Sequence, residues 1–193
     1  MKNIYLIVAP SGAGKTLVTE ILEQEYGYKS IQSYTTRQPR YEGELGHTFI
    51  SNEEFNTLVK NATVVAYTEF CGNRYCATAK QVEESDLYVI DPKGIEYFRE
   101  KYNGSKGIKV IYINSSTSTR YERMCGRSIS NGSTRLKASE KALERIENDV
   151  IEFYDYIHDI AKSDFIVENN YNSDINTVVD KIVGFITSCE GGD

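Results

Sequence analysis

A short apolar run that ends in a glycine-rich turn is the feature that most constrains the fold of this chain. Residues 4–8 are apolar without interruption and include β-branched side chains, as a strand buried on both faces requires. The turn closes with Lys15 and Thr16, and residues 17–24 then follow the pattern of an amphipathic helix. The order of strand, turn and helix predicts a phosphate-binding loop.

The residue types in this turn suit phosphate chemistry. Gly12 and Gly14 let successive backbone N–H groups point into one concavity, Lys15 reaches the outer phosphates, and the Thr16 hydroxyl binds Mg²⁺. Ala9 stands where the motif has its first glycine, and it is small enough to make the turn if its φ stays negative. The predicted site for the phosphates of a nucleotide comprises Ser11, Gly12, Ala13, Gly14, Lys15 and Thr16.

The charge of the chain argues against two classes of partner. Its 193 residues carry a net charge of −6, so it lacks the basic footprint of proteins that bind nucleic acids or anionic membranes, and we expect neither partner. No apolar stretch is long enough to cross a bilayer, which predicts a cytoplasmic protein. The cysteines lack the short paired spacing of a zinc site, so we expect free thiols; they are Cys71, Cys76, Cys125 and Cys189.

Strand-like runs alternate with helical patterns along the rest of the chain. This alternation predicts an α/β fold with a mainly parallel sheet and helices on both faces. The expected strands of that sheet after the first are 87–91, 107–114 and 164–168, and the expected helices are 93–102, 117–127, 138–161 and 173–187. Shorter strands at 29–34, 48–50, 63–70 and 74–78 predict a small inserted antiparallel lobe. Residues 128–137 are polar and rich in turn formers, which predicts a mobile flap.

Four segments, taken in chain order, resemble the guanylate kinase family. They are Ala9-Pro10-Ser11-Gly12-Ala13-Gly14-Lys15, Ser33-Tyr34-Thr35-Thr36-Arg37-Gln38-Pro39-Arg40, Gly72-Asn73-Arg74-Tyr75 and Ile90-Asp91-Pro92-Lys93-Gly94. The resemblance covers nearly the whole chain. It implies a P-loop NTPase-type fold and transfer of the γ-phosphoryl group of ATP to the phosphate of GMP, with Mg²⁺. It further implies one kinase domain, with a core of 1–33, 81–124 and 146–193, an acceptor-binding lobe at 34–80 and a helical lid at 125–145.

The resemblance also assigns roles to single residues. Arg37 and Arg40 match the arginines that hold the acceptor phosphate, and Tyr75 matches a tyrosine that donates to it. The chemistry agrees, because guanidinium forks match phosphate oxygens in pairs. Arg127 and Arg145 match two cations of the lid, which suit the charge that spreads over a migrating phosphoryl group. The remaining matched polar residues near the base or the metal are Ser33 and Asp91.

Several positions depart from the family where guanine is read. Ala66, Ala77 and Val89 stand in place of polar residues, and His47 replaces a tyrosine that binds phosphate. Glu69 replaces the missing glutamate only if a bulge intervenes, because residues three apart on a regular strand face opposite sides.

These substitutions leave the acceptor open. It is GMP, another nucleotide, or a sugar phosphate such as ribose bisphosphate. A non-catalytic module that binds phosphopeptides is a further alternative, against which the intact Lys15 and lid arginines argue. The chain is expected to act as a monomer or homodimer.

Two further departures lie later in the chain. The lid has about seven additional residues, with Ser128 to Thr134 as the extra material. Glu168 stands at the position of the asparagine that contacts adenine in the family, and Asn169 follows it. Either the contact with adenine is altered in this chain, or the alignment is shifted by one residue and Asn169 is the matching asparagine.

Overall fold

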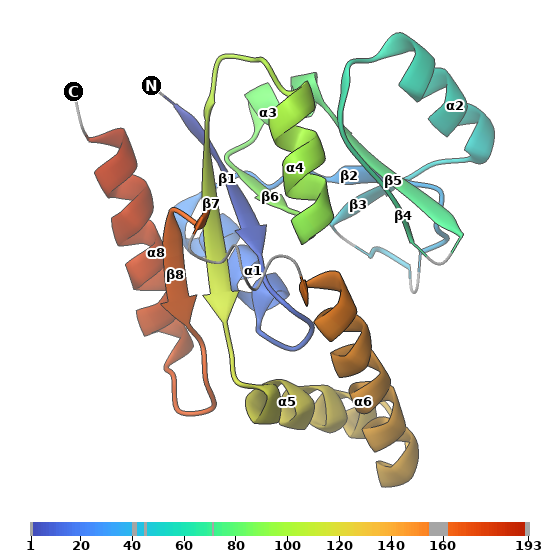
Figure 1. The fold of residues 1–193 in the computed structure, drawn as a ribbon, viewed down its shortest axis with the longest axis vertical. Coiled ribbons are helices and arrows are strands. Elements are labelled where there is room, and N and C mark those ends of the chain that lie inside the picture. Colours follow the sequence, from blue (N-terminus) through green and yellow to red (C-terminus); the bar gives the residue numbers. More distant parts are fainter. Residues whose placement is uncertain (1, 40–41, 45, 71, 155–161, 192–193) are drawn as a thin grey trace.

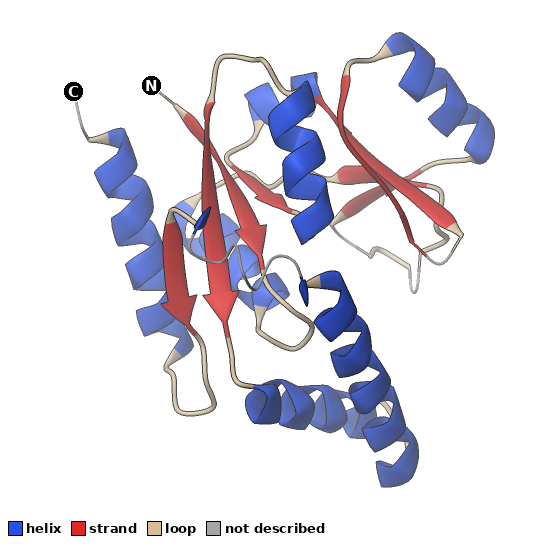
Figure 2. Cartoon of the chain, in the orientation of Figure 1, coloured by secondary structure: helices blue, strands red, loops and turns tan. Residues whose placement is uncertain are grey.

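The main sheet of the protein is parallel throughout. The structure is a computed structural model, and it describes residues 2–39, 42–44, 46–70, 72–154 and 162–191. In spatial order the strands of this sheet are β6 (Leu87–Val89), β1 (Asn3–Val8), β7 (Gly107–Asn114) and β8 (Phe165–Glu168), and each neighbouring pair is parallel. The predicted α/β fold with a parallel sheet is confirmed, and its helices flank the strands in Figure 2.

Strand β1 lies at the centre of the core because both of its faces are apolar. Ile4, Leu6 and Val8 belong to the core cluster on one side, whereas Tyr5 and Ile7 belong to the cluster on the other. Residues of α4 (Pro92–Lys101) line the first cluster, and residues of α1 (Lys15–Tyr26) and α8 (Ile175–Glu190) line the second. These helices confirm the predicted ones within a few residues, and α1 ends at Gly27, which has a left-handed φ of 73°.

A second sheet forms the inserted lobe beside the main sheet (Figure 1). In spatial order its strands are β3 (His47–Phe49), β2 (Ser33–Thr35), β5 (Asn73–Thr78) and β4 (Val64–Phe70). The pairs β2–β5 and β4–β5 are antiparallel as predicted, but β2 and β3 run parallel. The strand predicted at 29–34 is wrong in its bounds, because Ser30 bridges to Leu87 of the main sheet and the lobe strand begins only at Ser33.

Two helices belong to the lobe region. Helix α2 (Asn52–Asn61) begins after Ser51, which forms a capping box with Glu54. The short helix α3 (Ala79–Glu84) was not predicted, and Thr78 and Gln81 form the same kind of box at its start. Both helices therefore begin where a hydroxyl side chain satisfies exposed backbone N–H groups.

Two packed helices, α5 (Thr117–Ser130) and α6 (Arg135–Glu152), lie beyond the carboxyl end of β7 (Figure 1). The irregular conformation predicted for 128–137 is wrong, because α5 continues through Ser130 and only a short turn around Gly132, with a φ of 85°, precedes α6. The mobility of this segment stays a prediction. The buried Met124, Ala138 and Ala142 belong to these helices, so packing overrides the low helix propensity of the polar segment. Part of the helix predicted at 138–161 lies outside the described residues.

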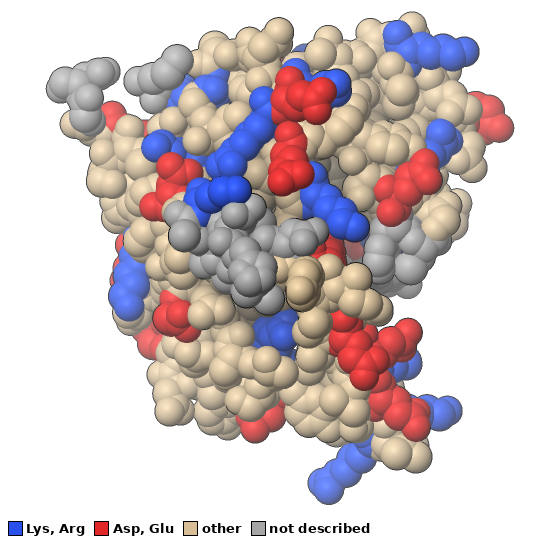
Figure 3. Space-filling model, in the orientation of Figure 1, with Lys and Arg blue, Asp and Glu red and all other residues tan. Residues whose placement is uncertain are grey.

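The surface of the described residues carries both signs of charge. On the face drawn in Figure 3, basic and acidic side chains are interspersed. None of the helices in the described ranges has an apolar stretch long enough to cross a bilayer. Cys76, Cys125 and Cys189 are free thiols, and Cys71 lies outside the described residues.

Candidate active site

The phosphate loop between β1 and α1 depends on two glycines. Gly12 and Gly14 have left-handed φ values of 78° and 96°. A Cβ atom on Gly12 would lie 2.8 Å from the Arg120 backbone oxygen, and one on Gly14 would lie 2.5 Å from Asn169 Nδ2. Side chains are therefore excluded at both positions by backbone conformation and by close neighbours.

Lys15 is the first residue of α1 and is half-buried. Its Nζ donates to the Ala9 carbonyl oxygen at 2.8 Å, so the side chain folds back along its own loop. Burial lowers the pKa of this amine, and the carboxylates of Glu152, Asp149 and Asp91 oppose that shift. An ammonium group in this position gains when anionic phosphates replace the water it has lost.

The loop is braced from the opposite side by Asn169, which is buried. Asn169 Nδ2 donates to the Ala13 carbonyl oxygen at 2.8 Å, and Arg123 Nη1 donates to the Asn169 carbonyl oxygen at 3.0 Å. Glu168 instead accepts from Asn114 at 2.7 Å. Of the two positions that the sequence left open, Asn169 is the one that contacts the phosphate loop.

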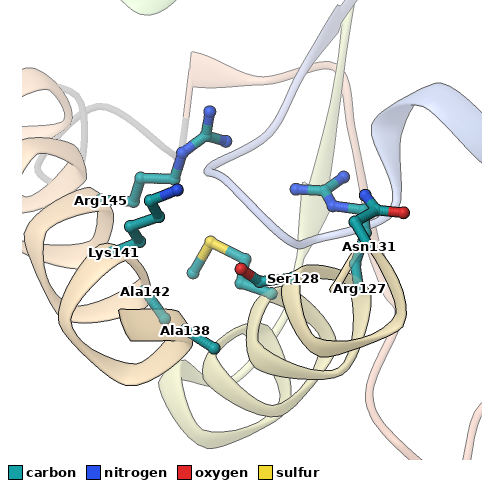
Figure 4. A pocket seen from close by; sticks show the side chains of 8 residues that line it. Arg127, Ser128, Asn131, Ala138, Lys141, Ala142 and Arg145 are labelled. Carbon is teal, nitrogen blue, oxygen red and sulfur yellow. The ribbon is translucent and has the colours of Figure 1, made fainter. Parts of the chain in front are cut away.

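A pocket of about 190 Å³ lies between α5 and α6, in the region predicted to be the lid. Arg127 on α5 and Arg145 on α6 both line it, from opposite sides (Figure 4). The structure adds Lys141, which sequence reasoning missed and which lies beside Arg145 (Figure 4). Its signal in the sequence is the spacing of four residues from Arg145, which puts both cations on one face of a helix.

One face of the lobe sheet collects three of the predicted acceptor residues. Ser33 pairs with His47 across β2 and β3, and Thr35 pairs with both Phe49 and Tyr75. Because paired residues and residues two apart share a face, Ser33, His47 and Tyr75 lie on the same side. Ser33 Oγ is 2.9 Å from His47 Nδ1, and the His47 and Tyr75 rings are 5.6 Å apart.

Arg37 follows β2 and is already paired. Its guanidinium donates to both carboxylate oxygens of Glu44, at 2.8 and 3.1 Å, and lies 5.2 Å from the centre of the Phe49 ring. The hydrogen bonds to Glu44 raise the pKa of Arg37, so it stays charged. The side chain is 14% exposed and that of Glu44 is 7% exposed. An acceptor phosphate at Arg37 must share or replace this carboxylate. The predicted partner Arg40 lies outside the described residues.

The sequence model of the guanylate kinase family matches residues 1–183. The chain belongs to this family. The guanylate kinase of Geobacter metallireducens is 34% identical over 80% of this chain and 78% of its own length, and that of Mannheimia succiniciproducens is 31% identical over 84% and 81%. A crystal structure of guanylate kinase from Anaplasma phagocytophilum has the same fold, with a TM-score of 0.59 and 24% identity over 97% of this chain and 85% of that one. The chain is thus a nucleoside monophosphate kinase by family.

In this guanylate kinase family member, Glu69 does not lie on the face of the lobe sheet that carries Ser33, His47 and Tyr75. We call that face the acceptor face, because these three residues are predicted to bind the acceptor. Glu69 pairs with Arg74, one residue out of phase with the pair Thr68–Tyr75, and it accepts a hydrogen bond from Tyr67. The register of β4 shifts between Val64 and Ala66. A bulge that moved Glu69 to the other face relative to Ala66 would have to lie between those two residues, where the pairing is regular. The structure therefore contradicts the prediction that Glu69 binds the acceptor. Thr68, on the acceptor face, is the polar side chain that sequence reasoning missed.

The positions expected to read guanine are apolar in the structure as well. Ala66 and Ala77 are paired across β4 and β5, and both belong to the core cluster beneath the lobe. Val89, at the end of β6, is 38% exposed. None of these three side chains can accept or donate a hydrogen bond.

Asp91 is engaged locally. Its Oδ1 accepts from the backbone N–H of Gly94 at 2.6 Å and caps α4, whose first residue is Pro92. The predicted metal or base contact at Asp91 thus competes with a helix cap, although its second carboxylate oxygen has capacity for another partner.

Replacing Arg37 with alanine is expected to raise the KM of the acceptor without changing the KM of ATP, because an acceptor clamp touches one substrate. A hydrogen bond to a charged group contributes about 1.5 to 3 kcal/mol, so kcat/KM for the acceptor should fall roughly 10- to 150-fold. Steady-state kinetics with each substrate varied measures this. Arg74→Ala is the matched control, since Arg74 contacts Asn52 and Asn56 on the opposite face. An equal loss of ATP affinity in Arg37→Ala would contradict the assignment.

Proposed function

We propose that this protein transfers the γ-phosphoryl group of ATP to the phosphate of GMP, forming ADP and GDP. The observation that carries the proposal is the family match over residues 1–183. In this proposal residues 34–80 bind the acceptor, residues 125–145 act as the lid, and the remainder is the core that holds ATP.

The donor end uses the loop after β1. Its backbone N–H groups and Lys15 surround the outer phosphates of ATP, and the helix α1 adds the partial positive charge of its N-terminus. The acceptor end uses the lobe, where the Arg37 guanidinium and the Tyr75 hydroxyl hold the acceptor phosphate. We assign Arg40 to the same clamp on the family pattern.

Transfer requires little covalent chemistry from the protein. An oxygen of the acceptor phosphate forms a bond to the γ-phosphorus while the bond from that phosphorus to the β–γ bridging oxygen breaks, and ADP takes the electron pair. No general base is needed, because the second pKa of a phosphate monoester is about 6 and the acceptor is already a dianion near neutral pH. The positive side chains of Arg127, Lys141 and Arg145 offset the charge that builds up on the equatorial oxygens.

The residues present fit Mg²⁺ bound together with ATP. Thr16 is exposed next to Lys15, so its hydroxyl is able to take one position on the ion, with nucleotide phosphates and water at the others. Among the described residues there is no cluster of three or more His, Cys, Asp or Glu side chains suited to a metal, which agrees with an ion held mainly by nucleotide phosphates and water. When bound, the ion neutralises charge on the β- and γ-phosphates.

A coupled assay for ADP, with GDP identified by chromatography, tests the proposed function directly. We expect ADP and GDP to form in equal amounts, and omission of GMP to stop nearly all ADP formation. ADP in the presence of Mg²⁺ should also raise the melting temperature, since ligand at 100 times its Kd adds about 2.7 kcal/mol to the stability. If GMP leaves the rate of ADP formation unchanged, the proposal is wrong.

A further inference from the structure

The carboxylate of Asp149 joins the phosphate loop to both lid helices. Asp149 lies near the end of α6, and its Oδ2 accepts from the backbone N–H of Ser11 at 2.9 Å while its Oδ1 accepts from the Ser11 hydroxyl at 3.0 Å. Arg120, in the first turn of α5, donates from Nη1 to Asp149 Oδ2 at 2.7 Å. One side chain of α6 thus contacts both the phosphate loop and α5.

Helical spacing places the lid cations on the same faces as this network. Arg145 precedes Asp149 by four residues on α6, so the two side chains lie one turn apart on one face. Arg127 follows Arg120 by seven residues on α5, which is close to two full turns. The contacts of Arg120 and Asp149 fix the rotation of α5 and α6 about their axes. They therefore also fix the directions of Arg127 and Arg145.

The ion pair is costly to keep for stability alone. The Arg120 and Asp149 side chains are 7% and 8% exposed, so both charges have lost most of their water. A protein in which well-packed apolar residues replace a buried ion pair is often as stable as the original. Fixing how the helices sit against the phosphate loop is therefore a better reason for this pair than stability. The buried apolar side chains at this contact are Met124 on α5 and the small Ala138 and Ala142 on α6, and the two alanines on α6 offer little resistance to rotation.

We propose that Arg120 and Asp149 are positioning residues that fix the orientation of α5 and α6 relative to the phosphate loop through Ser11. This orientation directs the side chains of Arg127 and Arg145 toward the transferring phosphate. This inference rests on the proposed function. Neither residue touches a substrate in this scheme. Arg120 and Asp149 act by holding the lid cations in place, and a displacement of about 1 Å at a reacting centre is enough to lower a rate about 100-fold.

The double variant Arg120→Met/Asp149→Leu separates positioning from stability. Its apolar side chains fill the same space, so we expect the melting temperature to stay near that of the wild type. The Ser11 N–H and hydroxyl, however, lose their acceptor. We therefore expect kcat to fall roughly 10- to 100-fold, with the KM of ATP and acceptor changed less than about threefold. Glu147→Gln, an exposed change on the same helix, is the matched control and should keep wild-type kcat.

A double variant with wild-type stability and wild-type kcat would overturn the proposal, because the pair would then serve the fold only. If the double variant does not fold, Ser11→Ala takes its place, because it removes only the hydroxyl bond to Asp149. A lowered kcat at constant KM supports the proposal, and an unchanged kcat overturns it. Amide hydrogen exchange gives a readout besides activity: we expect faster exchange at Ser11 in the double variant, with the β1 and β7 amides unchanged. A wild-type protein without phosphoryl transfer would refute the proposed function, whereas the exchange experiment would still test the network.

Discussion

Lys15→Ala is expected to abolish phosphoryl transfer and to leave the fold intact. Lys15 lies outside both core clusters, and its ammonium group donates a hydrogen bond to the Ala9 carbonyl oxygen of its own loop, so the core loses nothing when the side chain is removed. That ammonium group is nevertheless the cation nearest the outer phosphates in the proposed scheme. Removing one preorganised donor from a site of this kind lowers kcat by about 100- to 1,000-fold.

The expected loss is at the upper end of that range because of where Lys15 lies. Burial lowers the pKa of the amine, and the negative charges of Glu152, Asp149 and Asp91 act in the opposite direction. Without Lys15 the carboxylates of Glu152 and Asp91 lose a nearby cation, whereas Asp149 keeps its ion pair with Arg120. The unbalanced negative charge then weakens the binding of the ATP phosphates as well as transfer. The measurements are kcat and ADP affinity, with thermal unfolding and circular dichroism to confirm the fold. Lys80→Ala, an exposed lysine beside Glu84, is the control. Turnover within tenfold of the wild type in Lys15→Ala would refute the role of the loop.

The parts of the fold that were predictable from sequence are those in which neighbouring residues decide the structure. The phosphate loop requires left-handed glycines at 12 and 14, and both are present in the sequence where the backbone needs them. Strand β1 is apolar on both faces, which by itself indicates a sheet covered on both sides. Helix caps at Ser51 and Asp91 are also local, since each bonds to an N–H three residues away.

The parts that were not predictable depend on partners far along the chain. Residues 128–130 and 135–137 have a turn-forming composition, but they become helical because α5 and α6 pack on each other. The pairing of Asp149 with Ser11 joins residues 138 positions apart, which no motif reports. The side of the sheet on which Glu69 lies was also not predictable, because it depends only on the register of β4 with β5. That register shifts at Val64–Ala66, and the sequence does not indicate where the shift occurs.

Discrimination between bases is expected to be weaker than a hydrogen-bonding guanine site provides. A site that presents polar groups to a base rejects wrong bases by roughly 10⁴-fold or more, because the wrong base leaves those groups buried without partners. Here the acceptor face of the lobe offers Ala66 and Ala77, which are buried among core side chains, and Val89 offers no polar atom. Most of the binding free energy of a monophosphate then comes from its phosphate, through Arg37 and its neighbours.

Besides Tyr75, which is assigned to the phosphate, three described polar side chains on that face set the upper limit of selectivity. Ser33 and His47 are hydrogen-bonded to each other, so neither is fully available to a base, and Thr68 supplies one further hydroxyl. One or two such bonds separate bases by about 1 to 3 kcal/mol, or roughly 5- to 150-fold. We therefore expect kcat/KM for GMP to exceed that for AMP, CMP and UMP by less than about a thousandfold.

Steady-state kinetics with the four monophosphates and their deoxy forms measures the ratio. Ala66→Glu is an informative variant to compare with the wild type. It places a carboxylate at the position where the family has a polar residue and this chain has Ala66, opposite Ala77 across the strands. That variant should gain selectivity for GMP over AMP if the introduced carboxylate reaches the base, because guanine offers two donors on the edge where adenine offers an acceptor. A wild-type preference for GMP above about a thousandfold would mean that Ser33, His47 and Thr68 form a complete guanine site by themselves, and the apolar substitutions would then have no bearing on selectivity.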